Sequence, residues 1–312
     1  MRVLVTGGGG FIGSNLVRAL LERGDDVRIL DNFSTGNRAN LADLAGEIEV
    51  VEGELRSYER VHAATRGVEV VFHQGALPSV PRSVQDPLTT AAVNTEGALN
   101  VLLAARDEGI RRVVFASSSS VYGNSDELPR VETQNPDPIS PYGVSKLAAE
   151  RYCVSFSRVY ALETVALRYF NVFGPNQDPS SQYAAVVPRF ITTIADGRPV
   201  PIYGDGEQKR DFTFVSNVVE ANLLAAEAKE VSGTIVNVAT GRATSVHELA
   251  DTIGTILRLP VERELHPART GDIRDSYADV TRARELLGWE ARIGLEDGLR
   301  IAAEAFLERT LA

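Results

Sequence analysis

The feature that most restricts the fold of this chain is a regular alternation of short apolar runs and helical segments. The apolar runs, rich in β-branched residues, are RVLV (2–5), VRILD (27–31), IEVVEG (48–53), VEVVFHQGA (68–76), RRVVFASSS (111–119) and TVALRYFN (164–171). Segments with apolar residues at helical spacing, such as 15–24 and 97–110, separate them. Strands that are apolar throughout are buried on both faces, and intervening helices connect them into a parallel sheet. The sequence therefore predicts an α/β fold with a Rossmann-type, doubly wound parallel sheet.

A glycine-rich turn follows the first apolar run. Gly7, Gly10 and Gly13 form a GxxGxxG pattern that leads into the predicted helix at 15–24. Without side chains in the way, a pyrophosphate can reach backbone amides and the positive end of the helix, although a plain tight turn would need no ligand. Asp31 ends the next predicted strand, where a carboxylate accepts hydrogen bonds from the ribose hydroxyls of NAD and repels the 2′-phosphate of NADP. The pattern therefore predicts NAD as the cofactor.

A serine cluster and a Tyr–Lys pair form a second motif. Tyr142 and Lys146 are four residues apart, so on a helix they share one face. A neighbouring ammonium and a positive nicotinamide lower the pKa of a phenol, and the phenolate can take a proton from a sugar hydroxyl. Ser118 ends a predicted strand and can hydrogen-bond the same oxygen. A YxxxK spacing also occurs on solvated helices, but beside a dinucleotide pattern it favours Ser118, Tyr142 and Lys146 as catalytic residues.

Composition argues against several other classes of protein. A net charge of −10 argues against general nucleic-acid binding, while a basic pocket for a small anion stays possible. Cys153 is the only cysteine and the four histidines are scattered, so neither a disulfide nor a metal site is expected. His73, Cys153 and Trp289 are expected to pack in the interior. No apolar stretch approaches the roughly 18 residues of a membrane span, and the first is too short for a signal peptide, so we expect a cytoplasmic protein without a membrane partner.

The alternation becomes less regular after about residue 171. We expect residues 1–170 to form the NAD-binding Rossmann domain, and residues 171–312 to form mainly a smaller α/β domain for the substrate, with some segments returning to the first. Helices are still predicted at 218–228 and 245–257. Since there is no long linker or internal repeat, the two parts should pack as one unit.

Motifs along essentially the whole chain resemble a known family. VTGGGGFIGSNL, LDNFSTG, HQGALPSVPRSVQDP, SSSSVYG, SPYGVSK, LRYFNVFGPNQDP, GDGEQKRDFTFV and GDIRDSYAD are similar, in order, to motifs of the extended short-chain dehydrogenases/reductases and, among them, the nucleotide-sugar 4-epimerases. The resemblance implies reversible C4 epimerisation of a UDP-hexose, either UDP-glucose/UDP-galactose or the N-acetylamino pair. Tyr142 would take the O4 proton while NAD takes hydride from C4, and the 4-keto sugar would turn before the hydride returns.

The resemblance also implies which residues bind the two ligands. The cofactor would contact Gly7, Gly10, Phe11, Ile12, Gly13, Asp31, Asn32, Phe33, Ser34, Thr35, Gly36, Glu54, Leu55, Gln74, Gly75, Ala76, Asn94, Ser117, Tyr142, Lys146 and Phe170. The family usually has Asp where Glu54 stands. The UDP-sugar would contact Ser79, Ser118, Ser119, Asn171, Ala185, Val186, Tyr203, Arg210, Arg269, Arg274 and Ser276. Among these, Arg210, Arg269 and Arg274 would bind the pyrophosphate, and Tyr203 would lie beside the uracil.

Two departures from the galactose-type epimerases bear on the sugar. Ala185 stands where those commonly have Asn, and Ser276 falls where they often have a large aromatic residue over the sugar, unless Tyr277 takes that place. Small residues at both positions would leave room beside the C2 substituent. The sequence therefore favours acceptance of N-acetylhexosamines as well as hexoses.

Other activities of the same family remain as alternatives. A 4,6-dehydratase has an acidic pair directly after the catalytic serine or threonine, and a UDP-glucuronate decarboxylase has a Glu near the same place. Here Ser119 and Ser120 follow Ser118. A non-catalytic NAD-binding regulator would typically lack the Tyr–Lys pair. The resemblance also implies a homodimer through two helices, 89–108 and 142–161, although their apolar stripes could equally be intrachain core.

Overall fold

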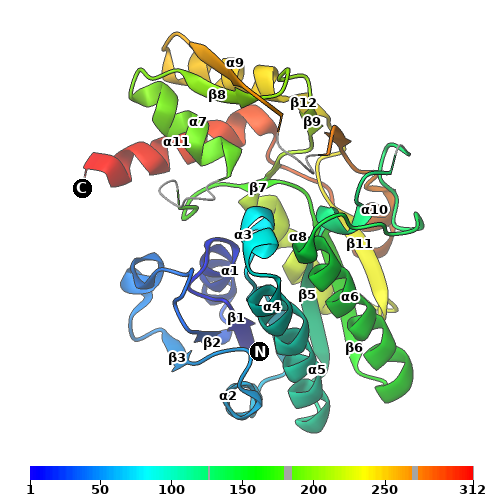
Figure 1. The fold of residues 1–312 in the computed structure, drawn as a ribbon. Helices are drawn as coiled ribbons and strands as arrows, with labels where there is room; N and C mark the ends of the chain where they lie inside the picture. The colour runs from blue at the N-terminus through cyan, green and yellow to red at the C-terminus, as the bar shows by residue number, and fades with distance from the viewer. Residues whose placement is uncertain (126, 179–184, 269–272, 312) are drawn as a thin grey trace.

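A computed structural model describes residues 1–125, 127–178, 185–268 and 273–311. Its centre is a seven-stranded sheet in which every neighbouring pair is parallel, in the order β11-β6-β5-β4-β1-β2-β3 (Figure 1). The strands are β1 (Arg2–Thr6), β2 (Asp26–Asp31), β3 (Ile48–Glu52), β4 (Val70–His73), β5 (Arg112–Ser118), β6 (Glu163–Tyr169) and β11 (Thr234–Val238). The strand order reverses between β1 and β4, as in a Rossmann fold. The predicted fold class is confirmed.

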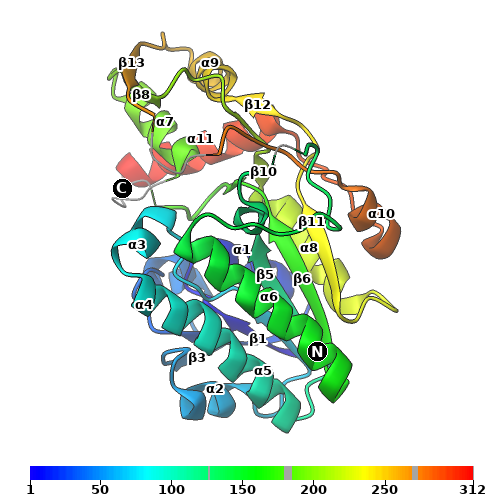
Figure 2. The same cartoon turned by 45° about the vertical axis from the view of Figure 1, so that its right-hand side comes forward.

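Successive strand residues point to opposite faces of the sheet and bury against different helices. Val3 and Val5 of β1 belong to one apolar cluster with α1 (Phe11–Glu22) and α8 (Val215–Glu227). Leu4 belongs to a second cluster with α2 (Tyr58–Thr65), α5 (Gly97–Asp107) and α6 (Pro141–Tyr160). Figure 2 shows α5 and α6 lying across the near face of the sheet. The sheet is thus covered on both sides.

The remaining elements of this part lie around the edges of the sheet. They are η1 (Arg38–Leu44), α3 (Val80–Gln85), α4 (Pro87–Ala91), η3 (Ser119–Tyr122) and α10 (Thr281–Leu287), the last packed beside β11. Because β11, α8 and α10 come from beyond residue 171, the second half of the chain contributes directly to the sheet layer.

A smaller group of elements lies above the carboxyl ends of the strands (Figure 1). It contains α7 (Val186–Ala195), α9 (Val246–Leu257) and α11 (Leu295–Leu311), with β8 (Val200–Tyr203) paired to β13 (Arg263–His266). Short strands join it to the sheet layer: β7 (Val172–Phe173) with β10 (Thr213–Phe214), and β9 (Lys209–Arg210) between β12 (Thr244–Ser245) and β14 (Asp275–Ser276).

One apolar cluster crosses from the sheet into this upper group. It joins Val3 and Leu16 to Phe190 of α7, Ile253 of α9 and Phe306 of α11. A shared core makes the two parts one packed unit, as predicted. Trp289 is also buried in this cluster, and its indole nitrogen donates to the carbonyl of Asn217 (2.9 Å).

The predicted helix at 89–108 is present and contains a π-turn. Residues Ala92–Glu96 form a π-helix (η2) between α4 and α5. The side chain of Asn94 is buried there, accepting from Leu77 N (2.8 Å) and donating to Leu77 O (3.2 Å) and Ser145 Oγ (3.0 Å). π-turns of this kind occur inside α-helices, often at functional sites. The predicted helix is therefore present, and the sequence analysis missed only its π-turn.

Candidate active site

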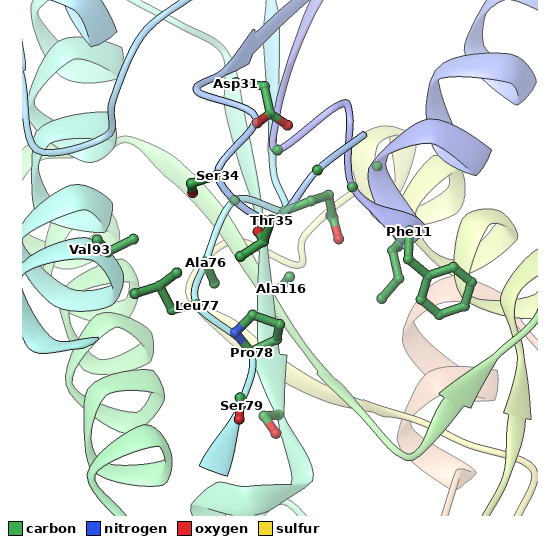
Figure 3. A pocket seen from close by; sticks show the side chains of 18 of the residues that line it. Phe11, Asp31, Ser34, Thr35, Ala76, Leu77, Pro78, Ser79, Val93 and Ala116 are labelled. Atoms are coloured by element: carbon green, nitrogen blue, oxygen red, sulfur yellow. The ribbon is translucent and has the colours of Figure 1, made fainter. Parts of the chain in front are cut away.

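A cavity of about 950 Å³ lies at the carboxyl ends of β1, β4 and β5. This is where the strand order reverses, the usual ligand crevice of doubly wound sheets. Figure 3 shows Asp31, Ser34 and Thr35 at one end of it, Phe11 at one side, and the segment Ala76–Ser79 crossing its centre. The cavity therefore joins the glycine turn to the serine cluster.

The glycine turn is packed too closely for side chains. Gly7 has φ +70°, and a Cβ there would lie 2.6 Å from the backbone of Gly75, in the turn after β4. A Cβ on Gly13 would lie 2.1 Å from the carbonyl oxygen of Gly7. These glycines let α1 begin directly against the turn, so the amino end of α1 faces the cavity with its backbone exposed to a ligand.

Asp31 organises the next turn from the end of β2. One carboxylate oxygen accepts from Gly9 N (2.8 Å) and the other from Phe33 N (2.7 Å). Phe33 has φ +53°, and its ring packs against Gly9 and under the guanidinium of Arg38. The carboxylate thus ties the glycine turn to the turn after β2 while remaining part of the cavity wall.

The amino end of α6 brings Tyr142 to the cavity. Ser140 caps the helix, Pro141 occupies its first turn, and Ser83 Oγ of α3 accepts from Tyr142 N (3.1 Å). The phenol is buried and hydrogen-bonds to Ser118. One turn further on, the ammonium of Lys146 donates to the carbonyl of Ala116 (2.9 Å). The structure therefore brings the three predicted catalytic residues together.

The predicted lowering of the phenol pKa relies on a bound nicotinamide, and in the protein alone the pKa is shifted in the opposite direction. Burial raises the pKa of Tyr142 by more than the hydrogen bond with Ser118 lowers it. Burial likewise lowers the pKa of Lys146 to about 8. The sequence argument counted two positive charges near the phenol but not the free energy of burying a phenolate.

Many of the predicted ligand residues line this cavity. They are Gly7, Gly10, Phe11, Ile12, Gly13, Asp31, Asn32, Ser34, Thr35, Gly36, Glu54, Leu55, Gln74, Gly75, Ala76, Ser79, Ser117, Ser118, Ser119, Tyr142, Lys146, Asn171 and Ala185. Glu54 lies there with its carboxylate paired to Arg56. Val186 begins α7 directly after Ala185.

Other predicted ligand residues lie outside the described lining. Phe170 is fully buried, Phe33 packs against Gly9, and Asn94 hydrogen-bonds to the backbone of Leu77. His73 and Cys153 are buried in the interior, as predicted. His73 Nδ1 lies 2.6 Å from Thr6 Oγ1, and burial lowers the pKa of its imidazole to about 3.

The predicted nucleotide-binding residues of the upper group also stand apart from the described lining. Arg210 on β9 donates to the carbonyl of Arg274 (2.9 Å) and pairs in register with Ser276, whereas Arg274 forms an ion pair with Asp205 (2.9 Å). Tyr203 stacks on His266, with ring centroids 5.2 Å apart. Arg269 lies outside the described residues.

The sequence analysis missed several residues of the wall. Arg82 on α3, Tyr169 on β6, and Asn176 to Asp178 after β7 line the cavity. Asn176 Nδ2 donates to Ser14 Oγ (3.0 Å), which holds the segment after β7 on the start of α1. The sequence motifs include these residues but do not predict that they line the cavity. The contact between residues 14 and 176, for example, depends on tertiary packing.

Comparisons with known proteins agree on one family. The profile of the NAD dependent epimerase/dehydratase family matches residues 3–239. A UDP-glucose 4-epimerase of Mycolicibacterium smegmatis is 40% identical over 319 residues, covering 99% of this chain and 100% of that protein. A UDP-N-acetyl-α-D-glucosaminuronate decarboxylase of Bacillus cytotoxicus is 32% identical over 319 residues, covering 98% of each chain.

Solved structures of similar proteins superimpose closely. The UDP-glucose 4-epimerase of Thermotoga maritima, with UDP-glucose, has a TM-score of 0.95 at 39% identity and full coverage of both chains. A UDP-N-acetylglucosamine 4-epimerase of Methanobrevibacter ruminantium, with UDP-N-acetylmuramic acid, gives 0.94 at 38% identity, covering 99% of this chain and 98% of that one. A Thermus thermophilus UDP-glucose 4-epimerase with NAD gives 0.91 at 38%, covering 98% and 99%. Within the described ranges, no helix is both long and apolar enough to cross a membrane.

Proposed function

Because the chain belongs to the NAD dependent epimerase/dehydratase family, we propose that it interconverts UDP-hexoses that differ in configuration at C4. Its cofactor is NAD and it acts on UDP-sugars. The observation that carries the proposal is the buried phenol of Tyr142, hydrogen-bonded to Ser118 and followed one helical turn later by Lys146 at the wall of the cavity.

The residues around the glycine turn fit a dinucleotide. Gly7 and Gly13 leave backbone at the amino end of α1 without side-chain cover, which suits a pyrophosphate. The carboxylate of Asp31 still has lone pairs free beyond its two backbone donors, because an ionised carboxylate offers about four acceptor positions. We assign these residues, with the segment Gln74–Ala76, to NAD.

In this proposal the protein supplies the proton transfer. Bound NAD supplies the hydride acceptor and donor for C4, and a positive charge next to the phenol. Tyr142 takes the proton from the sugar O4 and later returns it, and Ser118 holds the same oxygen by a hydrogen bond. Lys146 stabilises the phenolate electrostatically from the carbonyl of Ala116. Burial of the phenol keeps bulk water away from the keto sugar between the two steps.

The upper group of elements is proposed to bind the UDP part. Arg210 and Arg274 come together through a hydrogen bond and lie on β9 and just before β14, so they can present guanidinium groups to the pyrophosphate. Arg269 is proposed to join them, and Tyr203 to lie beside the uracil. Asn171, whose side chain donates to the carbonyl of Asp211 (3.2 Å), lies between this group and the cavity and is proposed to contact the diphosphate.

Small side chains support a site that accepts both plain and N-acetylated sugars. Ala185 contributes only a methyl group to the cavity wall, and Ser276 is a small buried residue on β14. Small side chains at both positions would leave room beside the C2 substituent, although of the two only Ala185 is in the described lining. We therefore propose that UDP-N-acetylglucosamine and UDP-N-acetylgalactosamine are substrates along with UDP-glucose and UDP-galactose.

The same cavity argues against decarboxylation as the main activity, although a decarboxylase is among the relatives. Ser119 and Ser120 follow Ser118 at the wall, so this stretch provides hydroxyls rather than a carboxylate. The dehydratase alternative would also need an added acid or base to eliminate water from the sugar. Epimerisation needs only the phenol and the hydride carrier at C4.

The test is to incubate the purified protein with each of the four UDP-sugars and resolve the C4 epimers. We expect interconversion of both pairs, and for Tyr142→Phe a loss of roughly 100- to 10,000-fold in kcat with NAD still bound. Absence of interconversion for all four would refute the epimerase assignment. A Tyr142→Phe variant with unchanged kcat would show that another group is the base.

Three further proposals concern the whole protein. We propose that residues 1–170 form the NAD-binding domain and residues 171–312 mainly the substrate domain, with β11 and α8 returning to the sheet layer. A homodimer forms through the helices at 89–108 and 142–161. The cytoplasmic location expected from the sequence stays a prediction.

A further inference from the structure

We propose that Glu150 and Arg168 are positioning residues for the active site. Through Ser117 they fix where α6 lies against the end of β5. The inference rests on the proposed function, because Tyr142 is assigned there as the base. Neither Glu150 nor Arg168 is part of the described cavity lining. Their effect on the reaction would therefore be indirect.

Three residues on one face of α6 contact three consecutive residues of β5. Tyr142 hydrogen-bonds to Ser118, Lys146 Nζ donates to Ala116 O (2.9 Å), and Glu150 Oε2 accepts from Ser117 Oγ (2.8 Å). The three helix residues are spaced four apart, so they follow one another along the same face. Along α6, Tyr142 is the first of the three and lies at the cavity, and Glu150 is the last and lies outside the described lining.

Arg168 holds Glu150 from the neighbouring strand. In the parallel pairing of β5 with β6, Ser117 lies opposite Arg168, so both reach the same carboxylate. Arg168 Nε donates to Glu150 Oε2 (2.9 Å) and Nη2 to Oε1 (2.7 Å), and both side chains are 0% exposed. The guanidinium also lies 4.5 Å from the ring centre of Tyr122. The carboxylate is thus fixed by three donors from two strands.

The ion pair is better explained by positioning than by stability. Burying two charges is costly, and an apolar pair of similar volume is often at least as stabilising. Apolar contacts, however, tolerate small sliding movements, whereas directional hydrogen bonds do not. A slide of α6 by one residue, about 1.5 Å, would carry the phenol out of hydrogen-bond distance of Ser118.

Two double variants separate positioning from stability. Glu150→Gln with Arg168→Gln removes both charges but leaves an amide oxygen that can accept from Ser117. Glu150→Leu with Arg168→Met removes both charges and the acceptor. Both should fold, because neither leaves a lone buried charge. Steady-state kinetics, bound NAD, and crystal structures of both holoproteins give the readouts.

We expect the Gln/Gln variant to keep kcat within about threefold of the wild type, and the Leu/Met variant to lose at least about tenfold in kcat with KM changed less than about twofold. In the crystals, the Tyr142–Ser118 hydrogen bond should persist in Gln/Gln and be lost in Leu/Met. Should Leu/Met fail to fold, Ser117→Ala breaks the same link and should show the same kinetic loss.

Equal losses in both double variants, or wild-type kcat in Leu/Met, would overturn the inference. If the wild type turns over none of the UDP-sugars, the proposed function fails, but the crystal structures still test the positioning role. An intact Tyr142–Ser118 hydrogen bond in Leu/Met would overturn that role. Loss of this hydrogen bond would support it.

Discussion

At the scale of single residues, Tyr142 and Lys146 form a pair that burial pushes toward the neutral forms. The pKa of the phenol is raised and that of the ammonium is lowered to about 8, so near neutral pH both groups hold their protons. The positive charge of oxidised NAD beside the phenol would favour the phenolate. Proton transfer would therefore be coupled to the oxidation state of the cofactor.

The buried ammonium should make stability depend on pH. Below about pH 8 Lys146 is charged in both the folded and unfolded states, and burial of the charge disfavours folding. Between pH 8 and its unfolded value of 10.5 the unfolded chain binds the extra proton, so stability rises with pH. At pH 7 Lys146→Met should therefore be more stable than the wild type by up to about 3 kcal/mol.

Urea unfolding of both proteins at pH 7 and pH 10 measures this difference. The gain from Lys146→Met should shrink toward zero at the higher pH, and other titrating groups cancel in the comparison. A gain that is equal at both pH values would mean that Lys146 is not the group that titrates.

Residue spacing predicts that Ser118, Tyr142 and Lys146 come together, but it does not predict their electrostatics. Ser118, Tyr142 and Lys146 meet because strand ends and helix faces follow from local pattern. The bonds of Asp31 to Gly9 and Phe33, and the sign of the Tyr142 pKa shift, depend on the completed packing around these residues. No local pattern contains that information.

At the scale of elements, the π-turn η2 links the wall of the cavity to α6. Asn94 binds both backbone groups of Leu77, a cavity residue, and also Ser145, next to Lys146. Asn94→Leu should leave the Leu77 backbone groups buried without partners, costing roughly 2–5 kcal/mol of stability and weakening retention of NAD.

Denaturant unfolding and the NAD content of the purified protein test this effect. The matched control is Asn100→Leu on α5, which loses a single hydrogen bond, to Leu55 O (2.9 Å), and should be milder in both readouts. If Asn94→Leu unfolds like the control and keeps its NAD, the π-turn does not support the cavity.

Elements with a clear period were predictable, and those built by long-range pairing were not. The six predicted runs all contain strands of the sheet, each starting or ending within a few residues of the expected range. β11 was missed although four of the five residues in its sequence, TIVNV, are β-branched. The two-residue strands β9, β12 and β14 exist only through pairing between residues more than thirty positions apart.

At the scale of the whole molecule, exposed apolar residues gather on the outer side of α4 and α6. Leu88 on α4 is 83% exposed and Val159 on α6 is 66% exposed, with Val144, Tyr152 and Tyr160 also exposed along α6. Val144, Tyr152, Val159 and Tyr160 lie in the helix at 142–161 proposed for the homodimer, and Leu88 directly precedes the one at 89–108. Such a surface is unusual on a free monomer.

Sedimentation of the wild type, Leu88→Glu and Val159→Glu tests the dimer. We expect a dimer for the wild type and a shift toward monomer for both variants, since a buried unpaired carboxylate opposes association. Leu265→Glu, at a 67% exposed residue on β13, is the matched control and should stay dimeric. A monomeric wild type at micromolar concentration would contradict the proposal.

The apolar cluster that runs from β1 through α7 to α11 has a mechanical consequence for turnover. Closure of two rigid domains needs an interface at which they can separate, and among the described residues this cluster is continuous across that boundary. We therefore expect local loop movement, rather than domain separation, to exchange substrate and product. In the proposed reaction, a cavity of constant outline would let the tethered keto sugar turn without being released.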